Sequence, residues 1–302
     1  MSSELKMWQR VAYLPLGGLL WLLSQLPLEA LYLVADFIAM IAHRVVKYRL
    51  RVVRHNIRDS FPQKSEEELR RIESQFYHHL ANVFVETIKV PGMSAEQMKR
   101  RMRFEDAELI DRLFDEGKSI IIYTSHFANW EWIPSIALWC RHKEAVYAHV
   151  YKPLSNKWFD RYFLKIRGVY NFSIPMNRVL RQMVEWRKDG VQSIVGFLSD
   201  QRPRRSTSTV DVDFMGRPTK FIAGTEEIAR KFGLAVLFFD TRCDKRGHYV
   251  STIRLVAEDA SALEFGEVTR RYAAMLEQSI QATPGAYLWS HNRWNLKKNE
   301  LK

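Results

Sequence analysis

The N-terminal part of the chain is strongly apolar, and its pattern predicts helices that contact a membrane. Residues 7–26 are mostly apolar and about as long as a helix that crosses a bilayer. Residues 28–42 are also apolar, but this stretch is shorter and contains Glu29 and Asp36. A single span, a re-entrant hairpin and a helix lying in the interface therefore all remain open for this segment.

The next segment, residues 44–58, contains six basic residues and no acidic residue. Its basic positions recur at steps of three and four, and Val46, Leu50, Val53 and Ile57 form an apolar stripe at the same spacing. This pattern predicts an amphipathic helix at an anionic membrane surface; a solvated helix packed on the protein's own core is the alternative. The excess of positive charge also favours a cytoplasmic position for the following domain.

Beyond residue 62 the pattern changes to alternating helices and strands. Residues 65–90 are predicted to be helical, with Ser65 and Glu68 forming a capping box at the start. Three charged helical stretches each end in a glycine that precedes an apolar run rich in Ile, Val and Phe: Gly117, Gly190 and Gly233. Two further strands are expected at 144–151 and 248–256.

Strands that alternate with helices predict an α/β fold with a mixed, largely parallel sheet flanked by helices. No linker divides the part that follows the basic segment. We therefore expect two regions: a membrane-anchoring region with basic amphipathic helices at 1–62, and a catalytic domain at 63–302.

Composition narrows the classes of function. The chain is 47% hydrophobic, which is enough for a large core, and its formal net charge is +12, which suits an acidic partner. Nucleic acid is not the expected partner, because the basic residues concentrate beside the apolar segment and no recognition motif is present. The two cysteines, Cys140 and Cys243, indicate neither a disulfide framework nor a metal site.

The candidate chemistry lies in residues 121–132, IIYTSHFANWEW, where His126 follows an apolar strand and Glu131 comes five positions later. Ligands of open α/β sheets bind beyond the carboxyl ends of strands, which is where His126 is expected. If His126 lies in a turn and Glu131 in the first turns of a following helix, the carboxylate can hold one ring nitrogen. The other nitrogen would then act as a general base towards a hydroxyl group.

Other reaction classes lack their motifs. The sequence around Ser125 is not Gly-x-Ser-x-Gly, so a serine hydrolase elbow is not supported. The chain has no His-Glu-x-x-His and no phosphate-binding glycine loop. We therefore expect neither a metal ion nor a diffusible cofactor.

At this point the chain resembles a known family. HFANWE at 126–131 is similar to the His-x-x-x-x-Asp/Glu motif of glycerolipid-type acyltransferases, and the whole chain resembles the lipid A biosynthesis (lauroyl/myristoyl) acyltransferases. Further blocks occur in the same order as in that family: RHNIRDSFP at 54–62, YKPLSN at 151–156, LSDQRP at 198–203, FMGRPT followed by GTEEIAR at 224–230, and PGAYLWSHNRW at 284–294.

The resemblance implies a glycerol-phosphate acyltransferase-like fold and the transfer of a fatty acyl chain from acyl carrier protein to a hydroxyl of a lipid A precursor. It implies a location at the bacterial inner membrane, with the catalytic domain facing the cytoplasm. Related enzymes acylate other glycolipids, so another phospho- or glycolipid acceptor is an alternative. A non-catalytic membrane lipid-binding protein is a second alternative.

These expectations assign roles to individual residues. His126 is the expected base, Glu131 its orienting acid, and Arg167 or the backbone amides at 127–129 the donors to the oxyanion. Cationic side chains are expected at the phosphorylated headgroup of the acceptor, where Arg suits bidentate contact and Lys acts as a point charge. The substrate-binding candidates are Lys152, Arg161, Asp200, Gln201 and Arg202. Trp130, Trp132, Phe197 and Phe214 would line an acyl tunnel or pack in the core.

Overall fold

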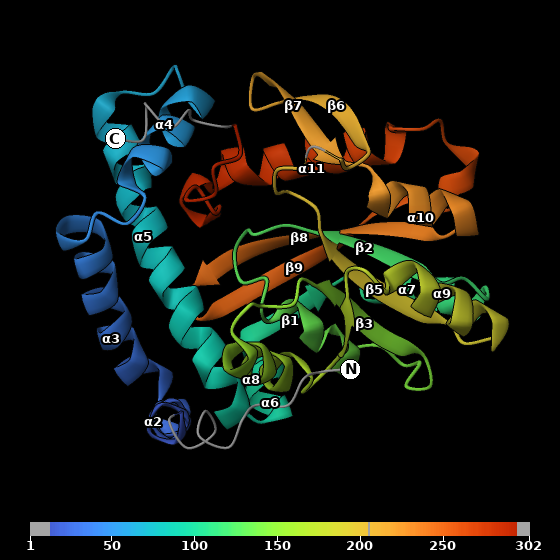
Figure 1. The fold of residues 1–302 in the computed structure, drawn as a ribbon, viewed down its shortest axis with the longest axis horizontal. Helices are drawn as coiled ribbons and strands as arrows, with labels where there is room; N and C mark the ends of the chain where they lie inside the picture. Colours follow the sequence, from blue (N-terminus) through green and yellow to red (C-terminus); the bar gives the residue numbers. More distant parts are fainter. Residues whose placement is uncertain (1–12, 205, 295–302) are drawn as a thin grey trace.

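The computed structural model describes residues 13–204 and 206–294, and a seven-stranded sheet forms its centre (Figure 1). In spatial order the strands are β1 (Met102–Glu105), β9 (His248–Ala257), β8 (Ala235–Lys245), β2 (Ile120–Thr124), β5 (Ser193–Leu198), β3 (Val146–Tyr151) and β4 (Phe172–Pro175). Every neighbouring pair is parallel except β8 and β9. The predicted mixed, largely parallel sheet is therefore confirmed.

All five strands expected from the sequence are present, and β2 shows why their pattern was clear. Each of its five residues is buried, since strands β8 and β5 flank it and helices cover the sheet. A parallel strand that is buried on both faces reads as a continuous apolar run. The pattern did not reveal the short strands β1 and β4, nor the separate antiparallel hairpin of β6 (Thr209–Phe214) and β7 (Arg217–Ile222).

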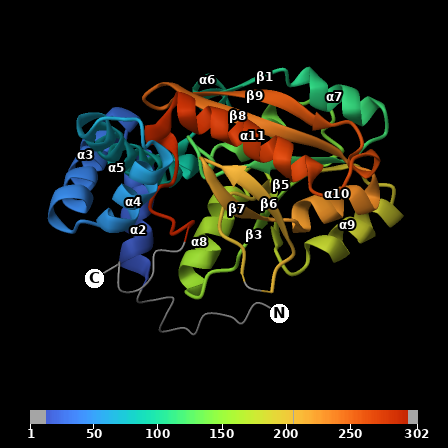
Figure 2. The same ribbon diagram turned by 90° about the horizontal axis from the view of Figure 1, so that it is seen from above.

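The helices form two groups around the sheet (Figures 1 and 2). The first group, at one end of the sheet, consists of α2 (Leu14–Gln25), α3 (Leu28–Met40), α4 (Leu50–Ser60) and α5 (Glu66–Lys89). The others are α6 (Ala95–Arg101), α7 (Glu108–Asp115), α8 (Lys157–Arg167), α9 (Val179–Lys188), α10 (Gly224–Phe232) and α11 (Glu267–Ala282). Helix α11 packs against β8 and β9. Helices α2, α3 and α4 all pack against the long helix α5.

The expected helix ends and caps are present. Gly117, Gly190 and Gly233 all have positive φ angles, of 77°, 69° and 61°, and each follows the end of a helix and precedes a strand. Glycine is favoured there because an L side chain is strained in this left-handed conformation. The Ser65 side chain accepts a hydrogen bond from the Glu68 amide, and the Glu68 carboxylate accepts one from the Ser65 amide, which confirms the capping box.

The basic segment differs from the prediction in two ways. It is not one helix over 44–58: five π-helical residues, Ile41–Val45, precede a break, and α4 begins only at Leu50. In the break, Lys47 and Arg49 have positive φ angles of 53° and 51°. The apolar stripe of α4 also does not face a membrane, because Val53 and Ile57 are buried in the main core. The alternative of a helix packed on the protein's own core is the one the structure contains.

The first apolar stretch also differs from a spanning helix. Of residues 7–26, residues 7–12 lie outside the described part, and α2 covers 12 residues of the remainder. Among residues 13–204 and 206–294, no helix combines the length and the apolar character that crossing a membrane requires.

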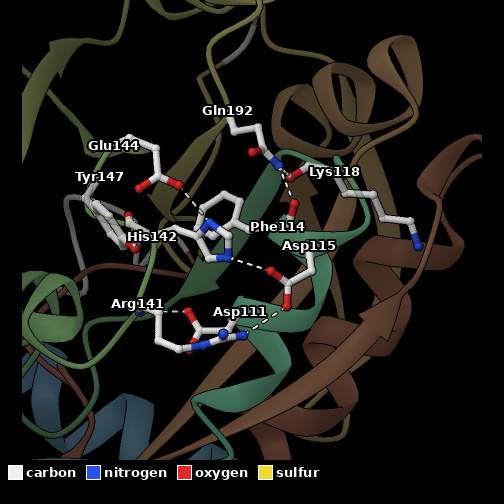
Figure 3. Close-up of polar contacts among 9 residues, drawn as sticks. All are labelled: Asp111, Phe114, Asp115, Lys118, Arg141, His142, Glu144, Tyr147 and Gln192. Carbon is white, nitrogen blue, oxygen red and sulfur yellow. Dashed lines mark hydrogen bonds and ion pairs between the residues drawn. The ribbon is translucent and has the colours of Figure 1, made fainter.

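A polar cluster fixes the segment between η3 (Ile133–Leu138) and β3 to helix α7 (Figure 3). His142 contacts Glu144 at 2.8 Å through Nδ1 and Asp115 at 2.9 Å through Nε2, and Arg141 also contacts Asp115. The hydrogen bond to Glu144 is the main cause of a raised pKa for His142. The cluster precedes β3, so it lies at the amino edge of the sheet, away from His126.

A buried carboxylate caps the start of α11. Glu226 of α10 has no exposed surface and accepts hydrogen bonds from the backbone amides of Gly266 at 2.6 Å and Thr269 at 3.1 Å. These amides belong to the first turn of α11, where a negative charge also interacts favourably with the helix dipole. Glu226 therefore holds α10 and α11 together, which explains a structural need for an acid within the GTEEIAR block.

We predict that Glu226→Ala lowers the free energy of unfolding by about 3 kcal/mol, because it leaves buried amide donors without acceptors. Glu227→Ala is the matched control, since Glu227 is the exposed neighbour on the same helix and should cost less than about 0.5 kcal/mol. Chemical denaturation of the two variants checks the prediction, and equal losses would contradict it.

Candidate active site

The register of two parallel strands brings His126 and Asp200 together. Strands β2 and β5 are neighbours, and their last residues, Thr124 and Leu198, lie opposite each other. His126 and Asp200 each follow two residues later, so both leave the sheet at the same carboxyl edge. The structure accordingly has His126 Nδ1 2.8 Å from Asp200 Oδ1. His126 thus occupies the strand end that the sequence predicts.

The contacts of His126 assign its tautomer. Because Asp200 is an acceptor, the 2.8 Å contact assigns the proton to Nδ1. Nε2 is then the unprotonated nitrogen, and its lone pair accepts a hydrogen bond from the side-chain amide of Gln201 at 3.2 Å. The His126 side chain is 17% exposed and that of Asp200 only 3%. The ring is therefore backed by a buried carboxylate on one nitrogen and contacts a neutral amide on the other.

The electrostatic environment keeps Asp200 ionised. Burial alone would raise the pKa of this carboxyl group, but the charge of His126 and hydrogen bonds from its ring and backbone outweigh burial. The pKa of Asp200 is therefore below its ordinary value, and the carboxylate is available to stabilise a positive charge on His126.

Glu131 does not make the contact expected of it. Its two carboxylate oxygens accept hydrogen bonds from Arg167 Nε at 2.9 Å and Nη2 at 2.6 Å, a bidentate pair, and Oε1 also accepts one from Trp130 Nε1 at 3.2 Å. The carboxylate on a ring nitrogen of His126 is that of Asp200 instead. Arg167 more than offsets the effect of burial, so the pKa of Glu131 is lowered.

The reason for this difference is the local backbone. The residues after His126 form turns, not the helix that would direct Glu131 back to the ring, and the next regular element is the 3-10 helix η3. Ala128 has a positive φ of 50°, which is uncommon for a residue with a side chain. Glu131 consequently points to α8, where Arg167 is the last residue.

Two other segments hold the loop of residues 126–132, which we call the His126 loop. The C-terminal segment binds it through Ala128 N to Ala286 O at 3.0 Å and Leu288 N to His126 O at 3.0 Å. Helix α5 binds it through His79, whose Nε2 contacts the Ala128 carbonyl at 3.0 Å. Since the Ala128 amide is already bonded, it is not a donor for an oxyanion in this structure.

The expected substrate-binding residues lie in different surroundings. Lys152 is exposed and directly follows β3, a neighbour of β5, so it lies at the same sheet edge as His126. Arg161 is half-buried on α8. Gln201 contacts the ring of His126, and the backbone amide of Arg202 donates to His291 Nε2 at 3.1 Å. The edge therefore combines the base with Lys152 and Arg202, while Arg161 is on the helix that supplies Arg167.

Among the four aromatic side chains named from the sequence, three are core residues. Trp132, Phe197 and Phe214 are buried within the main hydrophobic core. Trp130 is half-buried, and its ring lies 5.3 Å from that of His126 in an edge-to-face arrangement. Trp130 is therefore the one of the four that lies beside the ring of His126.

Sequence reasoning missed the residues that position the His126 loop, namely His79, Glu86 and Asn129. It also assigned Asp200 to the substrate. A signal for Asp200 was present, because Asp200 and His126 each follow the end of a predicted apolar strand by two residues. His79 and Glu86 lie seven residues apart on α5, which places them on one helix face, but periodicity alone does not distinguish them from other inward-facing positions.

No group of three or more His, Cys, Asp or Glu side chains has the arrangement of a metal site within the described parts of the chain.

Comparison with known proteins gives consistent matches over nearly the whole chain. The model of the family described as bacterial lipid A biosynthesis acyltransferase matches residues 2–296. The chain is 25% identical over 287 residues to the lipid A biosynthesis lauroyltransferase of Escherichia coli K12, covering 93% of this chain and 90% of that protein. It is 23% identical over 281 residues to the lipid A biosynthesis palmitoleoyltransferase of the same organism, with the same two coverages.

The environment of His79 predicts how stability depends on pH. Burial lowers the pKa of His79 from 6.5 to about 4. Between these values the unfolded chain binds a proton that the folded chain does not, so the contribution of His79 is full above pH 6.5 and is lost as pH falls towards 4. His79→Gln keeps a donor for the Ala128 carbonyl but does not titrate.

We therefore expect the free energy of unfolding of His79→Gln to fall less steeply than that of the wild type between pH 6.5 and 4. The difference in slope should approach about 1.4 kcal/mol per pH unit. Denaturation curves across this window measure it. His149 and His291 also have pKa values lowered to about 4 by burial, so both proteins lose stability and only the difference is diagnostic. Identical slopes would contradict the assignment.

Proposed function

The chain belongs to the bacterial lipid A biosynthesis acyltransferase family and is therefore an acyltransferase, and from this premise we propose that it moves a fatty acyl chain from acyl carrier protein to a hydroxyl of a lipid A precursor. The observation that carries the proposal is the hydrogen-bonded pair of His126 and Asp200, with only a neutral amide, that of Gln201, bonded to the second ring nitrogen. A base of this kind suits direct attack by an alcohol.

In the proposed mechanism His126 is the general base. Its Nε2 takes the proton of the acceptor hydroxyl as that oxygen attacks the thioester carbon of the donor. The tetrahedral intermediate then expels the carrier's thiolate, and the imidazolium returns the proton to the sulfur. Asp200 stabilises the imidazolium through Nδ1, which is the role that the sequence had suggested for Glu131. No acyl-enzyme intermediate is needed.

We assign Glu131 and Arg167 to the charge that develops in the transition state. Glu131 uses both oxygens to fix the Arg167 guanidinium, and the carboxylate's lowered pKa supports a persistent ion pair. A rigid cation close to the base can stabilise an oxyanion without reorganisation. Glu131 thus acts through Arg167, and the two residues form one functional unit.

Lys152, Arg161, Gln201 and Arg202 are the proposed contacts for the acceptor. Lys152 and Arg202 follow strand ends at the edge that carries His126, so phosphate groups bound there would bring the sugar hydroxyls near the base. Gln201, which contacts Nε2 directly, would move from the ring to the acceptor when a hydroxyl takes its place.

The proposed route to a lipid acceptor is an apolar surface on the first helices. Helix α3 buries Leu31, Ala35 and Ala39, yet exposes Leu33 and Phe37 on its other side, with 74% and 59% of their surface accessible. We call the exposed apolar residues of this region the α2–α3 surface: Leu14, Leu19, Trp21, Leu22, Leu26, Leu33, Val34, Phe37, Met40, Val45, Val46 and Tyr48.

A helix that is apolar on all sides needs an apolar neighbour on each of them. Four exposed basic residues lie just beyond α3: Arg44 within the π-helical residues Ile41–Val45, and Lys47, Arg49 and Arg51 after them. This composition favours docking in the plane of an anionic membrane. We propose that the α2–α3 surface lies in the inner membrane from its cytoplasmic side and that the sheet edge with His126 receives the acceptor there.

We predict that His126→Ala lowers kcat by about 10²–10⁴-fold, because it removes the general base. Asp200→Asn should lower kcat by at least about 10²-fold, because an amide cannot stabilise the imidazolium electrostatically. The assay uses acyl carrier protein loaded with a fatty acid and a lipid A precursor in mixed micelles. Full activity of His126→Ala would overturn the mechanism.

His142→Ala is the matched control, because His142 also lies between carboxylates but at the opposite edge of the sheet. It should keep wild-type activity. Parallel assays with a phospholipid and a non-phosphorylated glycolipid distinguish the acceptors, and a wild-type protein that transfers no acyl chain to any of them while binding vesicles would favour the lipid-binding alternative.

A second prediction concerns the membrane surface. Leu33→Glu combined with Phe37→Glu should reduce binding to vesicles that contain anionic phospholipid by at least about tenfold. The reason is that two apolar side chains that would be buried in the membrane interface are replaced by charged ones. Co-flotation with vesicles measures the effect. Phe265→Glu is the control, since Phe265 is 46% exposed and precedes Gly266, which bonds to Glu226 of α10. Helix α10 lies at the opposite end of the molecule from α3 (Figure 2). Equal losses in both proteins would contradict the assignment of this surface.

A further inference from the structure

Helix α5 contains a buried acid that the proposed mechanism does not use. Glu86 has no exposed surface, and its carboxyl group contacts three neutral donors. These are Tyr32 of α3 at 2.8 Å, Tyr249 of β9 at 2.8 Å and Asn129 of the His126 loop at 2.7 Å. Burying a carboxyl group is costly unless its hydrogen bonds are made, so this group must have a compensating structural use.

The contact to Asn129 reaches the centre of the His126 loop. The Asn129 side chain has no exposed surface and bonds at both ends: its Nδ2 donates to Glu86, and its Oδ1 accepts the backbone amide of Trp132 at 3.1 Å. The indole of Trp132 in turn donates to the backbone carbonyl of Glu86 at 3.2 Å. Glu86 therefore contacts the loop through both its side chain and its backbone.

Asn129 lies three residues after His126 and two before Glu131, so any displacement of Asn129 moves both. The backbone of the loop is held in one conformation at Ala128. This residue has a left-handed φ angle, and its backbone is hydrogen-bonded to α5 and to the C-terminal segment. A misplacement of about 1 Å at a reacting group is enough to cost about 10²-fold in rate.

We propose that Glu86 is a positioning residue for acyl transfer: through Asn129 it sets the geometry of the loop that carries His126 and Glu131. The inference rests on the proposed function for the loop's role in transfer. Its structural content is that the hydrogen bond between Glu86 and Asn129 determines where His126 lies.

Exchanging the amide and carboxyl groups of Asn129 and Glu86 tests the hydrogen bond between them. Asn129→Asp places a second carboxyl group against Glu86, removes the donor and should lower kcat about 10²-fold, with little change in the KM for the acyl donor. Adding Glu86→Gln restores one donor and one acceptor with their positions exchanged. We expect the double variant Glu86→Gln/Asn129→Asp to recover to within about tenfold of the wild type.

Glu86→Gln alone should stay within about threefold of the wild type. A glutamine can donate to the Tyr32 oxygen from its nitrogen while its oxygen accepts from Asn129 and Tyr249, so the bond to the loop is preserved and only the direction of the bond to Tyr32 is reversed. The raised pKa of Glu86, caused by burial, is consistent with a neutral side chain at this position. Loss of activity in this variant comparable to that of Asn129→Asp would count against the proposal.

The pH dependence gives a readout that a loss of stability would not produce. In Asn129→Asp the two facing carboxyl groups can share a proton at low pH but repel when both ionise. The ratio of the kcat of Asn129→Asp to that of the wild type should therefore rise as pH falls from 8 to 5. The ratio of the kcat of the double variant to that of the wild type should not change over this pH range. Among the other groups near Glu86, burial raises the pKa values of Tyr32, Tyr249 and Cys243 away from this range. The charged group nearby is Arg246, which lowers the pKa of Glu86 by its charge.

Tyr32→Phe and Tyr249→Phe are the matched controls, because each removes one donor to the same carboxyl group without touching the loop. Both should lower the melting temperature but leave kcat within about threefold. If all donors to Glu86 affected kcat in proportion to the melting temperature, Glu86 would be a core residue only, and the proposal would fail.

A spectroscopic measurement separates this inference from the proposed function. In protein with ¹⁵N-labelled histidine, the ring signals of His126, assigned with His126→Ala, should shift in Asn129→Asp and return in the double variant. This result would stand even if the wild type transferred no acyl chain, in which case only the proposed function would fail. Unchanged His126 signals in Asn129→Asp would overturn the positioning role.

Discussion

The parallel pairing of β2 and β5 is the constraint on which the site depends. Thr124 lies opposite Leu198 at the ends of these two parallel strands, so the residues that follow each strand lie at the same edge of the sheet. There His126 contacts Asp200. Sheet hydrogen bonds fix the distance between the two strand ends, and the His126 loop then sets the position of the ring between them. Asp200 is buried beside Nδ1, while the His126 side chain keeps 17% of its surface exposed.

The His126 loop shows how a strained segment is kept in place. Its backbone is not helical, and Ala128 has a left-handed φ angle, so the loop gains little from local backbone hydrogen bonds. Its anchors come instead from parts of the chain distant in sequence: α5 supplies His79 and Glu86, and the C-terminal segment supplies Ala286 and Leu288. The long helix α5 thus supports more than α2–α4, because its inner face also contacts the loop that bears His126.

The same helix connects the loop to the surface at which the lipid is proposed to arrive. Tyr32 binds Glu86 from α3, and Arg246, at the tip of the hairpin between β8 and β9, pairs with Asp36 of α3 and stacks over the ring of Tyr32. These contacts hold α3 rigidly against the sheet, although its other face consists of exposed apolar side chains. The proposed membrane surface and the site therefore form one packed unit.

Much of this architecture was predictable, because it follows from local rules. Runs of buried β-branched residues predicted the central strands, and the glycines after charged helices marked where those helices end, since both signals act within a few residues. The same reasoning found His126 at a strand end. It also identified an apolar N-terminus followed by a basic segment, but it assigned the apolar stripe of α4 to a membrane, because an apolar stripe has the same pattern whichever surface covers it.

The partners within the site were decided by tertiary structure. Glu131 is five residues from His126, and sequence proximity favoured it as the ring's carboxylate, yet a turn directs it to Arg167 on α8. Asp200, 74 residues away from His126, takes that place because strand order, which no local pattern encodes, makes β2 and β5 neighbours. The sequence by itself determined which elements form and that a histidine ends one of the strands. Only the packing of distant elements decided which acid it meets and which helix holds its loop, since hydrogen bonds of side chains depend on positions in space and not on spacing along the chain.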